Sequence, residues 1–432
     1  MNTSIVARNI RNHELLKSLE PLLSALNGFF PDESDAHTWQ ELLTFQNLYG
    51  GEHYRKEAGL VISHAEGVHI WDMAGKKYLD MNATYSAIAG GHVNVELITA
   101  IINQLFRITS TQNKLVNDKQ PLLLKRICEL TGQDKAILMN TGAEAVDTAT
   151  KAARRWAYRV KKVPGDMAEI ISTYGNFHGR TLNAIGLSGT KEYRADFGPY
   201  PPGYIHVPFG NIGALESAIT PNTAAFIVEV IQGEGGINLP PCGYVEAVRA
   251  LCTKHNVLLI FDEVQTGLGR TGKLFASDWY GVKPDGVVLG KALGQYQPVS
   301  AFAACKEVID VFTPGSHGST FGGTTLSCAS ALKSLEMITR DEQALVKNSH
   351  DVGAYFLERL LDIGANAHGK GLFVGICVDP KKAKADEVCH RLLENGVIAG
   401  AASNNVVRFS PSLIIGKREI NWVIPRIAAA LA

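Results

Sequence analysis

Apolar residues in the middle of the chain gather into short runs that alternate with segments of helical period. Between about residues 120 and 300 six runs have the length of strands: AILM, EIIS, IHVPF, AAFIVEVI, VLLIFDE and DGVVLG. Segments such as VEAVRALCTKH, in which apolar residues recur every three or four positions, stand between them. This alternation predicts βαβ units, and therefore a parallel sheet covered by helices.

The two flanks of this region have a different pattern. Upstream, GVHIWDMAGKKYLDM predicts two strands joined by a turn at Ala74 and Gly75. Beyond about residue 330 the pattern predicts a long helix, the strand KGLFVGICVD, a further helix and the strand VVRFSPSL. We expect the flanks to form one smaller α+β domain built from both ends of the chain.

The N-terminal region predicts a helix with one apolar face. Pro21 splits or restarts this helix, and Glu14 and Glu20 argue against a transit peptide. The face consists of Leu15, Leu16, Leu19, Leu22, Leu23 and Leu26. We interpret this region as an added structural or interface helix.

Charge and hydropathy exclude several classes of partner. The chain has 42 basic and 42 acidic residues, so it has no global field that would favour nucleic acid or an anionic membrane. No apolar run approaches the roughly 18 residues of a membrane span. The expected partners are small molecules and a second copy of the chain.

The seven cysteines are scattered, odd in number and without a C-x-x-C pair. This pattern fits neither a disulfide framework nor a zinc site, and we expect no metal. It favours a reducing compartment. Because the N-terminal region argues against a transit peptide, we expect the cytoplasm in preference to the mitochondrial matrix.

The stretch GLGRTGKL at residues 267–274 resembles a phosphate-binding P-loop. A P-loop ends in Ser or Thr, whose hydroxyl binds magnesium, but Leu274 stands at that position. Five residues, DEVQT, also separate the first glycine from the strand VLLIF. An ATPase is therefore the least favoured interpretation.

Two charged residues follow predicted strands. Asp262 comes directly after VLLIF, and Lys291 follows GVVLG. A desolvated lysine is a nucleophile toward aldehydes. The aldehyde that also needs a carboxylate is pyridoxal phosphate, because the carboxylate keeps its ring nitrogen protonated. If the strands are neighbours the two side chains meet at one edge of the sheet; otherwise each is an ordinary charged residue at a strand end.

Further groups follow other strands at the same expected edge. The segment NTGAE follows AILM and begins a helix, so backbone N–H groups near Gly142 and Ala143 would point at a phosphate. Phe177, after EIIS, is placed to stack on a ring, and His178 to line the site. Taken singly, the NTGAE segment could be only a helix cap, Phe177 only a core residue and His178 only a surface residue. Their common placement at strand ends favours a site.

Eight stretches, in their order along the chain, resemble the class III, fold-type-I pyridoxal-phosphate aminotransferases. They are MNATYSAIAGGH, MNTGAEA, GNFHGRTLNAIGLSG, FIVEVIQGEGG, LLIFDEVQTGLGRTGKLFA, VVLGKAL, HGSTFGG and VVRFSPSL. The resemblance extends from about Tyr54 to the C-terminus. It implies an α/β fold with a mainly parallel seven-stranded sheet and a smaller α+β domain. The implied division is an extension at 1–50, small-domain segments at 51–85 and 326–432, and a large domain at 86–325.

The resemblance also implies roles around the cofactor. Lys291 would form the Schiff base and then carry a proton, and Asp262 would pair with the pyridinium nitrogen. Gln265 would bind the ring oxygen, Phe177 would stack on the ring, and the Gly142 and Ala143 amides would hold the phosphate. In HGSTFGG, Thr320 would reach the cofactor phosphate of the partner subunit, so we expect a homodimer.

A further set implied by the resemblance concerns the substrate. Tyr54 and Arg180 would bind the α-carboxylate of an amine donor, and Tyr85 would pack beside its chain. Arg408 would receive the α-carboxylate of 2-oxoglutarate, while Glu234 would pair with Arg408 when the first substrate is bound. The expected reaction transfers the δ-amino group of L-ornithine to 2-oxoglutarate, giving glutamate 5-semialdehyde and glutamate.

Three departures from the family pattern leave alternatives open. After Lys291 the chain reads ALGQYQPVSA, where the family usually has a glycine pair and one more residue; Val230 stands where the family has proline, and Thr324-Thr325 where it has Asn-Pro. The alternatives are another donor (lysine, N-acetylornithine, a diamine or 4-aminobutyrate), an amino-acid racemase of the same fold, or a non-catalytic pyridoxal-phosphate-binding relative.

Overall fold

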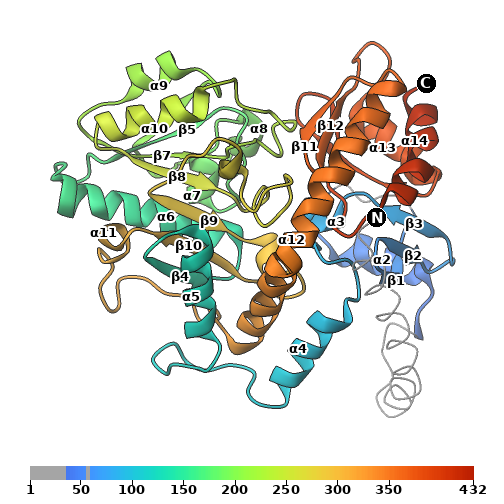
Figure 1. Ribbon diagram of the computed structural model, residues 1–432, viewed down its shortest axis with the longest axis horizontal. Helices are drawn as coiled ribbons and strands as arrows, with labels where there is room; N and C mark the ends of the chain where they lie inside the picture. Colours follow the sequence, from blue (N-terminus) through green and yellow to red (C-terminus); the bar gives the residue numbers. More distant parts are fainter. Residues whose placement is uncertain (1–35, 55–58) are drawn as a thin grey trace.

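The computed structural model describes residues 36–54 and 59–432 (Figure 1). The apolar helical face predicted at residues 15–26 lies outside the described residues. Among the helices that are described, none has the length and apolar character needed to cross a membrane.

A seven-stranded sheet forms the centre of the large domain. Its strand order is β4-β10-β9-β8-β7-β5-β6. All neighbours are parallel except β10, which runs antiparallel to β4 and β9. The strands are β4 (Lys135–Met139), β5 (Glu169–Thr173), β6 (Tyr204–Val207), β7 (Thr223–Val228), β8 (Leu258–Asp262), β9 (Gly286–Leu289) and β10 (Ser300–Ala304).

The six apolar runs are all strands, as predicted, whereas β10 was missed. Its sequence SAFAA has one aromatic residue and three alanines, and small residues have weak strand propensity. Every residue of β10 is buried, because the strand pairs on both edges and its side chains enter the apolar clusters on the two faces of the sheet. Tertiary pairing, not local sequence, makes this segment a strand.

Both faces of the sheet are covered by helices. In β8, Ile260 packs in one apolar cluster with helix α6 (Gly142–Trp156), whereas Leu259 and Phe261 pack in another with α10 (Tyr244–Lys254). Alternate residues thus enter opposite cores, as the two-residue period of a strand requires. The other helices of this domain are α5 (Gln120–Thr131), the π-helix Ala157–Lys161, α7 (Leu182–Gly186), α8 (Lys191–Arg194), α9 (Ile212–Ala218), the 3-10 helices Ala276–Trp279 and Lys291–Leu293, and α11 (Lys306–Ile309).

Both ends of the chain form the smaller α+β part, as predicted. Early strand β3 pairs in parallel with late strand β13 through Leu79 and Val397. One sheet has the order β1-β2-β3-β13 and a second the order β11-β12-β15-β14. The strands are β1 (Ile62–Glu66), β2 (His69–Asp72), β3 (Lys77–Asp80), β11 (Ala367–Lys370), β12 (Phe373–Cys377), β13 (Val397–Ile398), β14 (Gly400–Ala402) and β15 (Val406–Phe409). The residue boundaries assigned to the domains from sequence stay a prediction.

Helix α12 (Thr325–Asp362) lies between the large sheet and the smaller part (Figure 1). It is kinked at residues 340–343, where the backbone leaves helical geometry. The remaining helices are α2 (Trp39–Tyr49), the short turn α3 (Ala83–Ser86), α4 (Val95–Leu105), α13 (Ala385–Glu394) and α14 (Lys417–Leu431).

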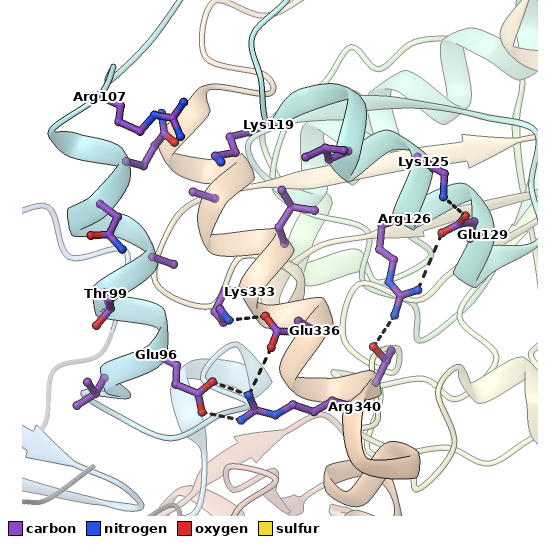
Figure 2. Close-up of a pocket in the computed structure, with 18 residues that line it drawn as sticks. Glu96, Thr99, Arg107, Lys119, Lys125, Arg126, Glu129, Lys333, Glu336 and Arg340 are labelled. Carbon is purple, nitrogen blue, oxygen red and sulfur yellow. Dashed lines mark hydrogen bonds and ion pairs between the residues drawn. The ribbon is translucent and has the colours of Figure 1, made fainter. Parts of the chain in front are cut away.

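A groove of about 1,110 Å³ lies between α4, α5 and α12. Figure 2 shows charged side chains along it, with Arg340 bonded to Glu96 on the facing helix. None of the residues assigned to the catalytic site from sequence lines this groove. The catalytic chemistry is instead found at the carboxyl ends of the strands.

Candidate active site

Asp262 and Lys291 lie at the same edge of the sheet because their strands are neighbours. Strand β8, which ends at Asp262, pairs in parallel with β9, and the Cα partner of Asp262 is Val288. Lys291 follows β9 after a single glycine. The sequence alone did not establish that these two strands are adjacent, and the structure shows that they are.

The Asp262 carboxylate is buried and fixed by two donors. Its Oδ2 lies 2.7 Å from His178 Nδ1, and its Oδ1 accepts the Val264 N–H at 3.0 Å. Burial by itself opposes the charged form of His178, but the hydrogen bond and charge of Asp262 raise its pKa above the ordinary value. The hydrogen bond from His178 holds the Asp262 carboxylate in one orientation.

The Lys291 backbone has a left-handed conformation, with φ +45°, a strained geometry that is common at functional sites. Burial lowers the pKa of its amine to about 8, although the charge of Glu234 opposes this shift. At pH 7 about a tenth of such an amine is deprotonated, far more than at the ordinary pKa of 10.5, and attack on a carbonyl requires the deprotonated form.

The predicted phosphate site is the N-terminus of α6. Thr141 and Glu144 cap it reciprocally, since Glu144 N–H donates to Thr141 Oγ1 and Thr141 N–H donates to Glu144 Oε2. Gly142 and Ala143 are the first two helical residues, whose N–H groups have no partner within the helix.

The backbones around this terminus pack too closely for larger residues. A Cβ on Gly142 would lie 2.9 Å from Val264 Cγ1, and one on Gly290 would lie 3.3 Å from the same atom. A Cβ on Gly179 would come within 2.6 Å of the Cβ of Ala143. The glycines thus bring amide donors, the Asp262 carboxylate and the Lys291 amine together, and this donor set fits pyridoxal phosphate.

Phe177 and Arg180 lie on the segment between β5 and α7, and Tyr193 of helix α8, which sequence reasoning missed, packs against both of them. The Arg180 guanidinium lies 4.1 Å from the ring centroid of Tyr193 and 5.3 Å from that of Phe177. The two rings pack edge to face. Tyr193 carries no motif, so only the fold reveals that it supports Arg180.

Glu229 was also missed. Its Oε2 accepts the Phe177 N–H at 2.9 Å and its Oε1 accepts the Gly233 N–H at 3.0 Å. Burial raises the pKa of this carboxyl to about 7, although the charge of His178 opposes the shift. A lone glutamate inside the apolar run FIVEVI was the available signal, because buried charges require partners.

Arg408 and Glu234 form an ion pair from segments far apart in sequence. Arg408 lies on β15 and is 1% exposed, whereas the Glu234 side chain is 20% exposed. Within the described part of the chain, Nε and Nη2 of Arg408 have no hydrogen-bond partner. The guanidinium also lies 5.8 Å from the ring centroid of Tyr85.

Tyr85 is presented by a tight turn of left-handed residues, with φ +55° at Tyr85 itself. Gln265 Nε2 donates to the Tyr85 carbonyl at 3.4 Å. Burial raises the pKa of Tyr85, and neighbouring Tyr54 adds to that shift. The structure thus brings Tyr54, Tyr85, Gln265 and Arg408 together.

Thr320 lies apart from this group on an exposed loop, next to Phe321, which is 63% exposed. The loop approaches the phosphate-binding segment through Asn140, whose Nδ2 donates to Ser319 Oγ at 2.8 Å. The role given to Thr320 by the resemblance requires a second subunit and stays a prediction.

The GLGRTGK stretch is a packing loop. Its Gly269 and Gly272 amides donate to the Leu274 and Gly269 carbonyls, both at 3.1 Å. Buried Arg270 donates to the carbonyls of Leu372 and Pro411, which joins the loop to the C-terminal part of the chain. These amides are not available for a nucleotide phosphate, so the ATPase interpretation is wrong.

An amine and a carboxylate at neighbouring strand ends, beside a capped helix N-terminus, define a pyridoxal-phosphate-dependent enzyme of the transferase type. The sequence profile of the family described as aminotransferase class-III matches residues 51–431. The chain therefore belongs to the class III aminotransferases, and it is a pyridoxal-phosphate-dependent aminotransferase.

The chain is similar to aminotransferases that act on ornithine or acetylornithine by name. The ornithine aminotransferase of Brevibacillus brevis is 46% identical over 386 residues, which cover 88% of this chain and 96% of that protein. The ornithine aminotransferase from Toxoplasma gondii ME49 superposes with a TM-score of 0.88 at 37% identity, over 94% of this chain and 97% of that one. The acetylornithine aminotransferase from Elizabethkingia anophelis superposes with a TM-score of 0.81 at 36% identity, over 91% and 98%.

Proposed function

We propose that this aminotransferase moves the δ-amino group of L-ornithine to 2-oxoglutarate, giving glutamate 5-semialdehyde and glutamate. The observation that supports the proposal most strongly is that two arginines of the site differ in exposure and in their bonding partners. Arg408 is paired with Glu234, whereas Arg180 is exposed and stacked on Tyr193. The charge of Arg408 is already neutralised by Glu234, so a donor's α-carboxylate should bind Arg180 in preference.

The proposed roles of the cofactor-facing residues follow from their chemistry. Pyridoxal phosphate, when bound, supplies a protonated ring that stabilises negative charge on the substrate carbon. Lys291 supplies the amine that attaches the cofactor and then moves the proton, and Asp262, held by His178, keeps the ring nitrogen protonated. The other contacts are proposed for Phe177 on the ring, Gln265 on the ring oxygen, and the Gly142 and Ala143 amides on the phosphate.

The substrate residues divide the two half-reactions. Tyr54 and Arg180 hold the α-carboxylate of ornithine, with Tyr85 beside its chain, so the distal amine points at the cofactor. In the second half-reaction 2-oxoglutarate places its two carboxylates on Arg180 and Arg408, and Glu234 moves aside.

A donor screen tests the proposed function. The purified enzyme at fixed 2-oxoglutarate should consume L-ornithine with a higher kcat/KM than L-lysine, N-acetylornithine, putrescine or 4-aminobutyrate. Preference for N-acetylornithine would favour the activity named for the Elizabethkingia anophelis protein. If no donor reacts, the screen supports the non-catalytic alternative, and interconversion of amino-acid enantiomers supports the racemase.

Arg180→Lys should raise the KM for L-ornithine by at least about tenfold, because a lysine cannot bind a carboxylate with a planar bidentate fork. Putrescine lacks the carboxylate, so its KM should change much less. The matched control is Arg194→Lys, since Arg194 stacks on Tyr200 in the same way. Equal losses for the two donors would show that Arg180 does not bind the carboxylate.

Glu234→Ala should speed the half-reaction with L-glutamate relative to that with L-ornithine. Arg408, no longer neutralised, would capture an α-carboxylate near the cofactor and favour reaction of the α-amine. Leaving this buried charge unpaired should also lower the free energy of unfolding by about 3 kcal/mol, near the low end for buried pairs because Glu234 is partly exposed.

Single-turnover loss of the cofactor's visible absorbance with each amino acid measures the ratio of the two rates. The control is Glu216→Ala, which breaks an exposed ion pair with Lys254. An unchanged ratio in Glu234→Ala would mean that Glu234 and Arg408 form a structural bridge only.

The same proposal includes a homodimer and a cytoplasmic location. A dimer would allow the exposed Thr320 to reach the cofactor phosphate of the other subunit. All seven cysteines are free, which supports a reducing compartment.

A further inference from the structure

The loop that carries Lys291 is fixed by one face of helix α12. We name residues 290–298 the lysine loop. Three serines donate their hydroxyls to carbonyls of this loop: Ser334 to Ala292 at 2.6 Å, Ser330 to Gly294 at 2.7 Å and Ser327 to Pro298 at 2.8 Å. Residues 327, 330 and 334 lie on one side of a helix because they are three and four positions apart.

Gln295 connects this loop to a second segment, residues 88–94, which we name the glycine turn. Its Oε1 accepts the Gly90 N–H at 2.6 Å, and its Nε2 donates to Ser334 Oγ at 2.8 Å. Gln295 is 8% exposed and has a φ of +51°. A left-handed glutamine whose amide groups are both bonded has a fixed orientation.

Tyr296 makes a second connection to the same turn. Its hydroxyl donates to the Gly91 carbonyl at 2.5 Å and accepts the Asn94 N–H at 2.6 Å. Asn94 Nδ2 in turn donates to the Gly90 carbonyl at 3.3 Å. The glycine turn is therefore bonded at three backbone positions to side chains of the lysine loop.

The glycine turn continues directly from the turn that presents Tyr85. Ile88 N–H donates to the Ala83 carbonyl at 3.0 Å, and Tyr85 N–H donates to Asn82 Oδ1 at the same distance. At the other end, His92 Nε2 lies 2.8 Å from Asp80 Oδ2, and Asp80 Oδ1 accepts the Ala83 N–H. A displacement of the glycine turn would therefore displace Tyr85.

We propose that Gln295 and Tyr296 are positioning residues that fix Lys291 and Tyr85 relative to each other and so set the length of donor chain that the site accepts. They occupy the loop in which this chain departs from the family's glycine pair. Glycines have no side chains and cannot make these bonds. The inference rests on the proposed function, because Tyr85 is taken to pack beside the donor.

The first measurement is donor selectivity. Tyr296→Phe keeps the ring and removes only the hydroxyl, whereas Gln295→Asn keeps an amide residue that tolerates a positive φ but is too short to reach Gly90. In each variant the ratio of kcat/KM for L-ornithine to that for L-lysine, one methylene longer, should fall by about tenfold, within the range of such discrimination. Tyr355→Phe, which removes a hydroxyl bonded to Asn421, should leave the ratio unchanged.

The second measurement is hydrogen exchange of the full-length holoenzyme. In Tyr296→Phe the Asn94 amide loses its acceptor, so it should exchange about fivefold faster, as expected for one net hydrogen bond. Amides of residues 83–88 and 292–295 should also exchange faster, because the two segments are no longer connected. The Tyr355→Phe control should leave these segments protected as in the wild type.

The outcomes separate this inference from the proposed function. Faster exchange at Asn94 with an unchanged donor ratio would reduce Gln295 and Tyr296 to structural residues and overturn the inference. If the wild type prefers a donor other than ornithine, the proposed function fails. The inference then stands or falls on the selectivity between that donor and its one-methylene-longer analogue, together with the exchange at residues 83–88.

Discussion

Lys291→Ala should reduce turnover with L-ornithine and 2-oxoglutarate by at least about a thousandfold, because the substitution removes the nucleophile and the proton carrier together. Both half-reactions need these functions, so single-turnover rates with ornithine and with glutamate should fall alike. Stopped-flow absorbance of the protein reconstituted with the cofactor measures both. The control is Lys306→Ala, which removes a lysine that follows the next strand and pairs with Asp310 on the surface.

The same variant should be more stable than the wild type in neutral, cofactor-free solution. The Lys291 pKa is about 8 in the fold against an ordinary value of 10.5, so burial of the charged amine costs about 3 kcal/mol below pH 8. From pH 8 to 10.5 the unfolded chain binds the extra proton, hence the wild type gains stability as pH rises. The stability advantage of the variant should shrink over that interval in thermal unfolding.

For the turnover prediction, a rate of Lys291→Ala within tenfold of the wild-type rate would show that Lys291 takes no part in the chemistry.

Asp262→Asn should slow the ornithine half-reaction by about a hundredfold to a thousandfold, the range found when one preorganised electrostatic group is removed. A neutral amide cannot hold the ring nitrogen in its protonated form, so the cofactor loses its capacity to accept electrons. The side chain keeps its shape, and Val264 N–H can still donate to the remaining oxygen. We therefore expect the fold and cofactor binding to persist.

A spectroscopic result accompanies this loss of rate. Because the charge and hydrogen bond of Asp262 raise the pKa of His178, Asp262→Asn should lower that pKa, which proton NMR of the imidazole can follow. His206, whose pKa burial lowers, serves as an internal reference. A normal half-reaction rate together with a lowered His178 pKa would identify Asp262 as a structural partner of His178.

Local sequence determined most of the elements that carry the chemistry. Each of the six apolar runs between residues 120 and 300 became a strand, because a buried strand needs only a short apolar segment with turns at its ends. Parallel strands place their carboxyl ends at one edge of a sheet. Asp262, Lys291 and the segment before Gly142 could therefore be assigned to one edge from their positions alone.

The tertiary structure decided which side chains meet across long separations. His178 contacts Asp262 over 84 positions, Arg408 contacts Glu234 over 174, and Gln295 contacts Gly90 over 205. The resemblance implied the pair of Arg408 with Glu234, but no periodicity in the chain encodes the other two. Tyr193 and Glu229 were missed for the same reason, and β10 became a strand only by pairing on both sides. Local pattern fixes the backbone conformation and the buried face of the strongly apolar runs, whereas the conformation of β10 and the contacts between distant segments depend on how the whole chain packs.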